Sequence, residues 1–350
     1  MKIAQVSPLI ESVPPLYYGG TERVVSYLTE ELVRQGHDVT LFASGDSVTS
    51  AQLEPVVDRS LRLHPNHPES TAYHSIMLGR LSKMAHLFDI IHFHIDILHF
   101  PMNYYLQTPN VTTLHGRLDL PDLGDVYREF DQVPLISISD HQRTPLPFAN
   151  WQATVYNGVP ADTYHFNAQP QGYLAFLGRI SPEKGIEDAI EIAIRAGMPL
   201  RIAAKVDKAD EEYYQKRIKP LLQHPLVEYI GEISEQEKDA FLGNAYAVLF
   251  PINWPEPFGL VMIESFACGT PVIAFNQGSV PEVMQDGETG FVVSGIEAAV
   301  DAVEKIDTIS RQCCRYLFEQ RFSSTAMARN YLRAYESIIG SRHFQTPIAV

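Results

Sequence analysis

Cysteine is scarce in this chain, and so is positive charge. Three cysteines in 350 residues (Cys268, Cys313 and Cys314) cannot form a disulfide framework, so the composition favours a reducing compartment. Lys and Arg total 27 against 42 Asp and Glu, a formal net charge of −15, which argues against a nucleic-acid partner. No apolar run reaches the length of about 18 residues that a membrane span requires, and residues 1–12 do not read as a signal peptide. These features predict a cytoplasmic protein.

Several nucleotide- and metal-binding motifs are also missing. The 21 glycines include no G-x-G pair, so the dinucleotide-binding fingerprint G-x-G-x-x-G is absent. The P-loop motif G-x-x-x-x-G-K-[ST] is absent too. No two Asp residues are separated by one residue, which removes the Asp-x-Asp metal clamp of many enzymes that use nucleotide sugars. A G-x-S-x-G nucleophile elbow is absent as well. Ordinary dehydrogenases, P-loop ATPases and serine hydrolases are therefore disfavoured.

One run of residues resembles a metal site. His92, His94 and Asp96 alternate along a predicted strand, and this H-x-H-x-D spacing occurs in metallo-hydrolases. The alternative is a strand end that projects polar side chains into a cleft. The metallo-hydrolase fold needs more ligands from later segments and alternates its elements differently, so we favour the second explanation and expect no metal and no other cofactor.

Short β-branched runs alternate with helical patterns, which is typical of parallel α/β architecture. The series of strands starts twice, near residues 1 and 172. We therefore predict two doubly wound domains whose ligands lie beyond the carboxyl ends of the strands. The predicted strands are 2–8, 38–44, 89–94, 111–116, 134–139 and 153–159 in the first half, and 172–179, 200–206, 227–231, 246–251, 271–276 and 290–293 in the second.

Two cations and two carboxylates carry the strongest functional signal. Arg179 ends a strand and Lys184 follows at a helix entrance, a suitable place for a diphosphate. Surface ion pairs with Glu183 or Glu187 are the alternative explanation. Glu256 and Glu264 lie on either side of a predicted helix start at 258–267, so they can grip different parts of one ligand. The amides of Phe258, Gly259 and Leu260 at that start suit an anion or sugar hydroxyls.

Taken with GSVPEVMQDGETGFVV (278–293), Gly19-Gly20, TTLHG (112–116) and NGV (157–159), these residues resemble the retaining glycosyltransferases of family 4. The resemblance covers nearly the whole chain. It implies a GT-B fold, with an N-terminal acceptor-side domain at 1–160, a donor domain at 161–322 and a C-terminal helix (about 323–350) that packs back on the first domain. Three details depart from the usual pattern: Pro160 follows NGV, Ser279 replaces a second glycine, and INWP (252–255) precedes Glu256.

The resemblance also implies a role for each matching residue. Arg179 and Lys184 would hold the donor diphosphate, Glu256 would contact the transferred sugar, and Glu264 would accept a hydrogen bond from the ribose. His115 would lie beside the sugar and the acceptor. Residues assigned to donor binding are Gly19, Gly20, Ile230, Gly231, Glu232, Phe258, Gly259 and Leu260, and those assigned to the acceptor side by position are Tyr17, Tyr18, His94, Asp96 and Arg117.

The implied activity is transfer of a hexosyl unit from a nucleoside diphosphate sugar, with UDP-sugars favoured, by a front-face displacement that needs no metal. The acceptor would be a small molecule, a glycan or a lipid-linked molecule, and peripheral membrane contact stays open. Two alternatives bind the same donor: an epimerase of the same fold, and a nucleotide-sugar-binding protein without catalysis.

Overall fold

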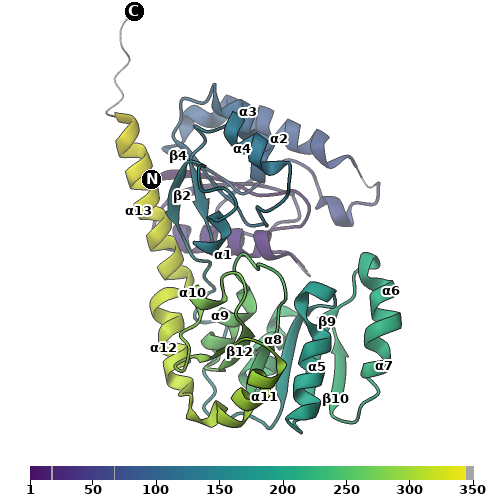
Figure 1. Ribbon diagram of the computed structural model, residues 1–350. Helices are drawn as coiled ribbons and strands as arrows, with labels where there is room; N and C mark the ends of the chain where they lie inside the picture. The colour runs from purple at the N-terminus through teal and green to yellow at the C-terminus, as the bar shows by residue number, and fades with distance from the viewer. Residues whose placement is uncertain (17–18, 67, 344–350) are drawn as a thin grey trace, which may run out of the picture. The chain divides into compact units, whose positions relative to one another are not determined.

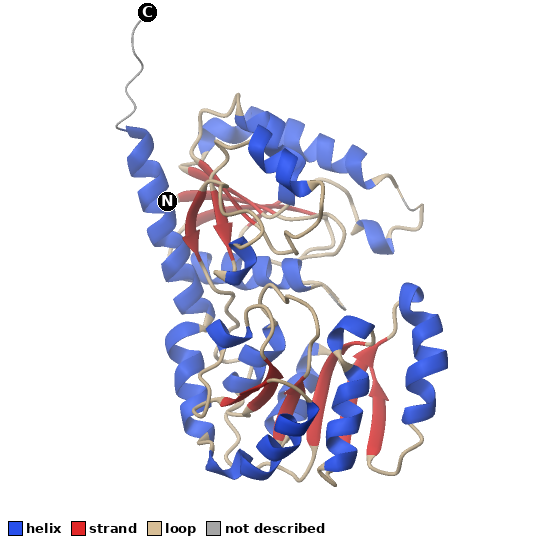
Figure 2. Cartoon of the chain, viewed as in Figure 1, coloured by secondary structure: helices blue, strands red, loops and turns tan. Residues whose placement is uncertain are grey.

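The computed structural model describes residues 1–16, 19–66 and 68–343, and the chain divides into two compact units. Unit 1 comprises Met1–Gly158 and Ser324–Val350, and unit 2 comprises Val159–Ser323. Each unit contains one parallel sheet with flanking helices (Figures 1 and 2). The predicted α/β class with two strand series is therefore confirmed.

Unit 1 has a seven-stranded sheet in the order β3-β2-β1-β4-β5-β6-β7. Its strands are β1 (Lys2–Val6), β2 (Asp38–Ala43), β3 (Gln52–Pro55), β4 (Ile90–Phe93), β5 (Asn110–Thr113), β6 (Leu135–Ser137) and β7 (Trp151–Thr154). Its helices are α1 (Gly20–Arg34), α2 (Ser70–Met84), α3 (Phe100–Asn103), α4 (Leu123–Glu129) and α13 (Ser324–His343). The last helix packs against α1, although nearly 300 residues separate the two.

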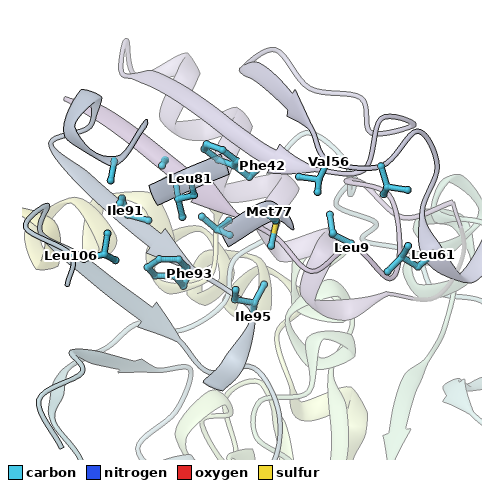
Figure 3. Close-up of a cluster of buried hydrophobic side chains, with 14 residues drawn as sticks. Leu9, Phe42, Val56, Leu61, Met77, Leu81, Ile91, Phe93, Ile95 and Leu106 are labelled. Carbon is cyan, nitrogen blue, oxygen red and sulfur yellow. The ribbon is translucent and has the colours of Figure 1, made fainter. Parts of the chain in front are cut away.

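A hydrophobic cluster joins α2 to the sheet of unit 1. Met77 and Leu81 of α2 contact buried side chains of the strands, among them Phe42 and Phe93 (Figure 3). The stretch 45–85 is polar at first and then helical by its sequence pattern, and its helical part is α2, whose Met77 and Leu81 cover one face of the sheet.

Unit 2 has a six-stranded sheet in the order β10-β9-β8-β11-β12-β13. Its strands are β8 (Leu174–Arg179), β9 (Leu200–Lys205), β10 (Val227–Gly231), β11 (Ala247–Phe250), β12 (Val272–Phe275) and β13 (Gly290–Val293). Its helices are α5 (Ile186–Arg195), α6 (Glu211–Tyr213), α7 (Lys219–Leu221), α8 (Glu235–Gly243), α9 (Leu260–Ala267), α10 (Val280–Val283), α11 (Ile296–Lys305) and α12 (Arg311–Arg321).

The ends of two helices in unit 2 test the predictions made from sequence. The capping box of Ser234 and Glu237 is confirmed at the start of α8. The predicted start of α9 at Phe258 is wrong by two residues, because Gly259 has φ 80° and a left-handed residue cannot continue a right-handed helix. Among the described residues, no helix has the length and apolar character needed to cross a membrane.

Candidate active site

The strand order of unit 2 brings Lys184 next to Glu256. β8 and β11 are neighbours in the sheet, and the turn Pro182–Lys184 follows β8. Gly185 lets this turn approach the end of β11, since its φ is 70° and a Cβ there would lie 1.9 Å from the carbonyl oxygen of Pro251. Lys184 forms an ion pair with Glu256, and the two side chains are only 18% and 13% exposed.

The unusual segment 252–255 holds this turn in place. The backbone amide of Asn253 donates to the carbonyl of Glu183 at 3.1 Å, and its side-chain amide donates to the carbonyl of Pro182, also at 3.1 Å. The ammonium of Lys184 lies 5.2 Å from the ring centroid of Trp254, within cation–π range. The segment therefore supports Lys184 from two sides.

The backbone of Glu256 is fixed by the segment that follows β12. A Cβ on Gly278 would lie 2.4 Å from the carbonyl oxygen of Glu256, so only glycine fits there. The amide of Ser279 donates to that carbonyl at 3.1 Å, and its hydroxyl donates to the carbonyl of Phe258 at 2.8 Å. The serine that departs from the usual glycine thus adds a hydrogen bond to the loop before α9.

Arg179 lies in a cluster of carboxylates. It forms an ion pair with Glu183, and its guanidinium nitrogens lie 3.7 Å from Asp207 and 3.8 Å from Asp210. Lys205 adds a second cation, 2.8 Å from Asp207. Lys205, Asp207 and Asp210 are not among the residues predicted from the sequence. The signal for them is their position, because they end or follow β9, which pairs with β8 so that Arg179 faces Lys205.

Glu264 is buried in α9, with its side chain 4% exposed. Lys238 of α8 lies 3.1 Å from it and 3.0 Å from Glu235. The residues assigned to the nucleobase, Ile230-Gly231-Glu232, lie at the carboxyl end of β10, two strands from β8. Gly231 has φ 79°, at an irregularity in the pairing with β9.

Several residues predicted for the acceptor side, together with His115, lie at the carboxyl edge of the unit 1 sheet. His115 follows β5, and its Nε2 lies 2.9 Å from Nδ1 of His94, which follows β4. Asp96 has φ 48°, an uncommon conformation for a residue with a side chain, and desolvation raises the pKa of its carboxyl to about 6. Arg117 forms an ion pair with Asp119 at 2.7 Å.

Gly19 and Gly20 open α1, with Gly19 at the N-cap. A Cβ on Gly19 would lie 2.8 Å from the side chain of Pro15, so the close approach requires glycine. Tyr17 and Tyr18 lie outside the described residues.

His94, assigned to the acceptor side by its position, is buried within unit 1. Its side chain is 2% exposed, and Nε2, the nitrogen not paired with His115, lies 2.8 Å from Oε1 of Gln5. Both ring nitrogens are thus occupied inside the unit, so a direct acceptor contact would cost a buried hydrogen bond.

Both ring nitrogens of His92, the first residue of the H-x-H-x-D run, have hydrogen-bond partners in unit 1. Nδ1 of His92 lies 2.6 Å from the hydroxyl of Tyr335, and its Nε2 lies 2.7 Å from the hydroxyl of Thr113. Within the described part of the chain, no group of three or more His, Cys, Asp or Glu side chains is arranged to hold a metal ion.

Comparison with family models divides the chain in the same two halves. The model described as Glycosyltransferase Family 4 matches residues 18–162, and the model described as Glycosyl transferases group 1 matches residues 165–316. The sequence is 27% identical to glycogen synthase of Mycobacterium tuberculosis over 386 aligned positions, which cover 92% of each chain. It is 24% identical to the phosphatidyl-myo-inositol mannosyltransferase of Mycobacterium leprae, with 97% of this chain and 98% of the relative covered.

Solved structures show the same fold at lower identity. The sucrose-phosphate synthase of Thermosynechococcus elongatus superposes with a TM-score of 0.79 at 18% identity, covering 97% of this chain and all of that one. HepE of Anabaena, solved in complex with UDP and glucose, has a TM-score of 0.72 at 18% identity and covers 96% of this chain.

Proposed function

The chain belongs to the glycosyl transferases of group 1 and has the GT-B fold, and from this premise we propose that it is a retaining enzyme that transfers a hexosyl unit from a nucleoside diphosphate sugar to a hydroxyl acceptor. The observation that carries the proposal is the ion pair of Lys184 with Glu256 at the carboxyl edge of the unit 2 sheet. It joins the cation assigned to the diphosphate with the carboxylate assigned to the sugar, from two segments that are 72 residues apart.

Both assigned cations form ion pairs with carboxylates. Lys184 contacts Glu256, and Arg179 contacts Glu183. A bound diphosphate offers more negative charge than one carboxylate, so it competes for both cations. During reaction the negative charge on the leaving diphosphate grows, and fixed cations stabilise that charge more in the transition state than in the ground state.

The other donor contacts follow from the same edge of unit 2. The amides at the start of α9, at Phe258, Gly259 and Leu260, offer hydrogen bonds and the positive end of the helix dipole to the sugar hydroxyls or the diphosphate. We assign Glu264 to the ribose hydroxyls, which need a carboxylate that accepts two hydrogen bonds. The end of β10, at residues 230–232, is assigned to the nucleobase.

The proposed chemistry is a front-face displacement. The bond between the anomeric carbon and the diphosphate oxygen breaks, and its electron pair leaves with that oxygen. The acceptor oxygen forms the new bond on the same face, and its proton passes to a phosphate oxygen of the donor. Glu256 stabilises the positive charge that develops on the sugar. Two side-chain cations serve the diphosphate, so we propose that no metal is required.

The functions of unit 1 are part of the proposal. We assign His115 to the sugar and the incoming acceptor hydroxyl, Gly19 and Gly20 to the diphosphate, and Asp96 and Arg117 to the acceptor. The choice of UDP-hexose as the first donor to test is supported by a structural neighbour solved with UDP and glucose. The acceptor hydroxyl belongs to a small molecule, a glycan or a lipid-linked molecule.

The test uses UDP-, GDP- and ADP-hexoses without any acceptor. The matching donor should raise the melting temperature of the chain, because it binds only the folded state, and should be hydrolysed slowly. Formation of an epimer would instead establish an epimerase. Stabilisation with no turnover, either alone or with a panel of hydroxyl acceptors, would reduce the chain to a binding protein and overturn the proposal.

A further inference from the structure

A continuous chain of hydrogen-bonding side chains runs through the interior of unit 1 and ends at His115. It connects the loop after β5 with α13 through the central strands β1 and β4. All members except His115 are buried, with exposures of 2% or less. In order from the site inward, they are His115, His94, Gln5, Tyr335, His92, Thr113 and Tyr331.

The first links determine which nitrogen of His115 carries the hydrogen. The side-chain amide nitrogen of Gln5 donates to the hydroxyl of Tyr335 at 3.2 Å, so its Oε1 faces Nε2 of His94. An amide oxygen only accepts, and Nε2 of His94 must therefore be protonated. Burial lowers the pKa of His94 far below its usual range, so the ring is neutral and its Nδ1 is an acceptor. His115 must then donate from Nε2.

The remaining links run in the same direction. Because the oxygen of Tyr335 accepts from Gln5, its own hydrogen points to Nδ1 of His92 at 2.6 Å. His92 then donates from Nε2 to the hydroxyl of Thr113 at 2.7 Å. From His115 to Thr113 each group donates to the next one inward, so these five links support the same proton arrangement at His115.

This arrangement leaves Nδ1 of His115 as the group that meets a ligand. Desolvation lowers the pKa of His115 to about 4, so at neutral pH the ring is uncharged and Nδ1 has a free lone pair. Nδ1 has no hydrogen-bond partner within residues 1–16, 19–66 and 68–343. A bare imidazole nitrogen accepts a hydrogen bond from a hydroxyl group and cannot donate one.

We propose that Gln5 and His94 are positioning residues that hold His115 as the Nε2–H tautomer. In this tautomer, Nδ1 of His115 accepts a hydrogen bond from a hydroxyl group of the bound sugar or acceptor. Tyr335 of α13 sets the direction of the hydrogen bonds in the chain. The inference rests on the proposed function for the identity of the ligand. The tautomer itself is independent of that function.

Histidine ring nitrogens labelled with ¹⁵N test the tautomer directly in the full-length chain. The signals of His115 are those that vanish in His115→Gln. The expected pattern at neutral pH is a protonated Nε2 and an unprotonated Nδ1. A protonated Nδ1 would mean that the chain runs in the opposite direction, and it would overturn the inference.

Substitutions at position 94 separate positioning from simple packing. His94→Gln can accept from His115 with its oxygen and donate to Gln5 with its nitrogen, so it should keep the tautomer and most of kcat. His94→Leu removes both bonds and should lower kcat about tenfold, the loss of one positioning hydrogen bond, with little change in KM for the donor. Equal losses in both variants would refute a positioning role.

Two tyrosines of α13 provide a matched pair. Tyr335→Phe breaks the chain between Gln5 and His92, so the signals of His115 should shift toward a mixture of tautomers. Tyr331→Phe removes an equally buried hydroxyl beyond Thr113 and should leave those signals unchanged. Identical spectra for the two variants would overturn the role of Tyr335. If the tautomer is as expected but His115→Gln keeps full turnover, the assignment of His115 in the proposed function fails instead.

Discussion

Replacing Glu264 or Glu256 by glutamine is expected to change the affinity for a free nucleoside diphosphate in opposite directions. That ligand carries the ribose and the diphosphate but no sugar. Glu264 is assigned to the ribose, and a hydrogen bond to a charged acceptor contributes about 1.5–3 kcal/mol. Glu264→Gln should therefore weaken binding by roughly 10- to 150-fold. The ribose does not change during reaction, so KM for the donor should rise while kcat stays nearly constant.

Glu256→Gln should have the reverse effect on the same ligand. Glu256 forms an ion pair with the ammonium of Lys184, and both side chains are more than four-fifths buried. Without the carboxylate charge, Lys184 is available to the diphosphate. A partly exposed ion pair of about 1 kcal/mol corresponds to about a fivefold gain in affinity. The same variant should lose one or more orders of magnitude in kcat, about 1.4 kcal/mol each, because the charge developing on the sugar is no longer stabilised.

Titration calorimetry with the free nucleoside diphosphate measures both effects. Urea unfolding should also be measured to check that Glu264→Gln folds, because Glu264 is buried beside Lys238. The variant should fold, because Lys238 keeps Glu235 as a second partner. Glu212→Gln, which breaks an exposed pair with Lys216, is the matched control and should leave the affinity unchanged. A loss of affinity in both site variants, or an unchanged affinity in Glu264→Gln, would refute these two assignments.

Four further outcomes are expected. Lys184→Gln should lower kcat roughly 10- to 150-fold, against no change in the exposed control Lys216→Gln; a rise in KM alone would contradict its role. Turnover should survive excess EDTA, and a loss that Mn²⁺ or Mg²⁺ restores would show that a metal is required. Gly278→Ala should destabilise the chain to urea by more than Gly287→Ala, because both residues have positive φ but only the first would place its Cβ against backbone atoms; equal losses would exclude the close approach to Glu256. His99→Phe should reduce the pH dependence of the free energy of unfolding. Burial lowers the pKa of His99 to about 3, so below about pH 6.5 the unfolded chain binds a proton at His99 that the folded chain does not. His99 therefore makes the folded state less stable as the pH falls from about 6.5. The slope, measured by urea unfolding between about pH 6 and 4, should decrease by about 1.4 kcal/mol per pH unit; an unchanged slope would mean that His99 titrates normally in the folded state.

The strand pattern predicted the fold because buried parallel strands leave a strong signal in sequence. The runs LAFL and AVLF contain only apolar residues, which fit a sheet covered on both faces, and they lie in β8 and β11. The region 45–85 was not predictable in the same way. Its short strand β3 lies at the edge of the sheet and is only half-buried, so it needs no apolar run.

The sequence pattern placed Lys184 and Glu256 after two strands and close to a glycine, and the structure brings these two side chains into contact. The contacts of Arg179 with Asp207 and Asp210 could not be predicted from the sequence. They depend on the pairing of β8 with β9, and no local sequence pattern indicates which strands pair. The inferred tautomer of His115 depends on Gln5, 110 residues away in sequence, and on Tyr335, 220 residues away. Because a local sequence pattern does not connect such distant residues, Gln5 and Tyr335 look like ordinary polar residues of the core.

In unit 2 the charges assigned to the diphosphate, the sugar and the ribose are each paired with an opposite charge. Half-buried cations without partners would destabilise the fold, so Arg179, Lys184 and Lys238 each hold a carboxylate. A diphosphate that reaches Arg179 and Lys184 must replace Glu183 and Glu256 and leave both carboxylates with less compensation. Binding is then an exchange of partners, and its net free energy is smaller than the number of new contacts suggests. In the proposed reaction, Glu256 released from Lys184 would be available to stabilise the positive charge that develops on the sugar.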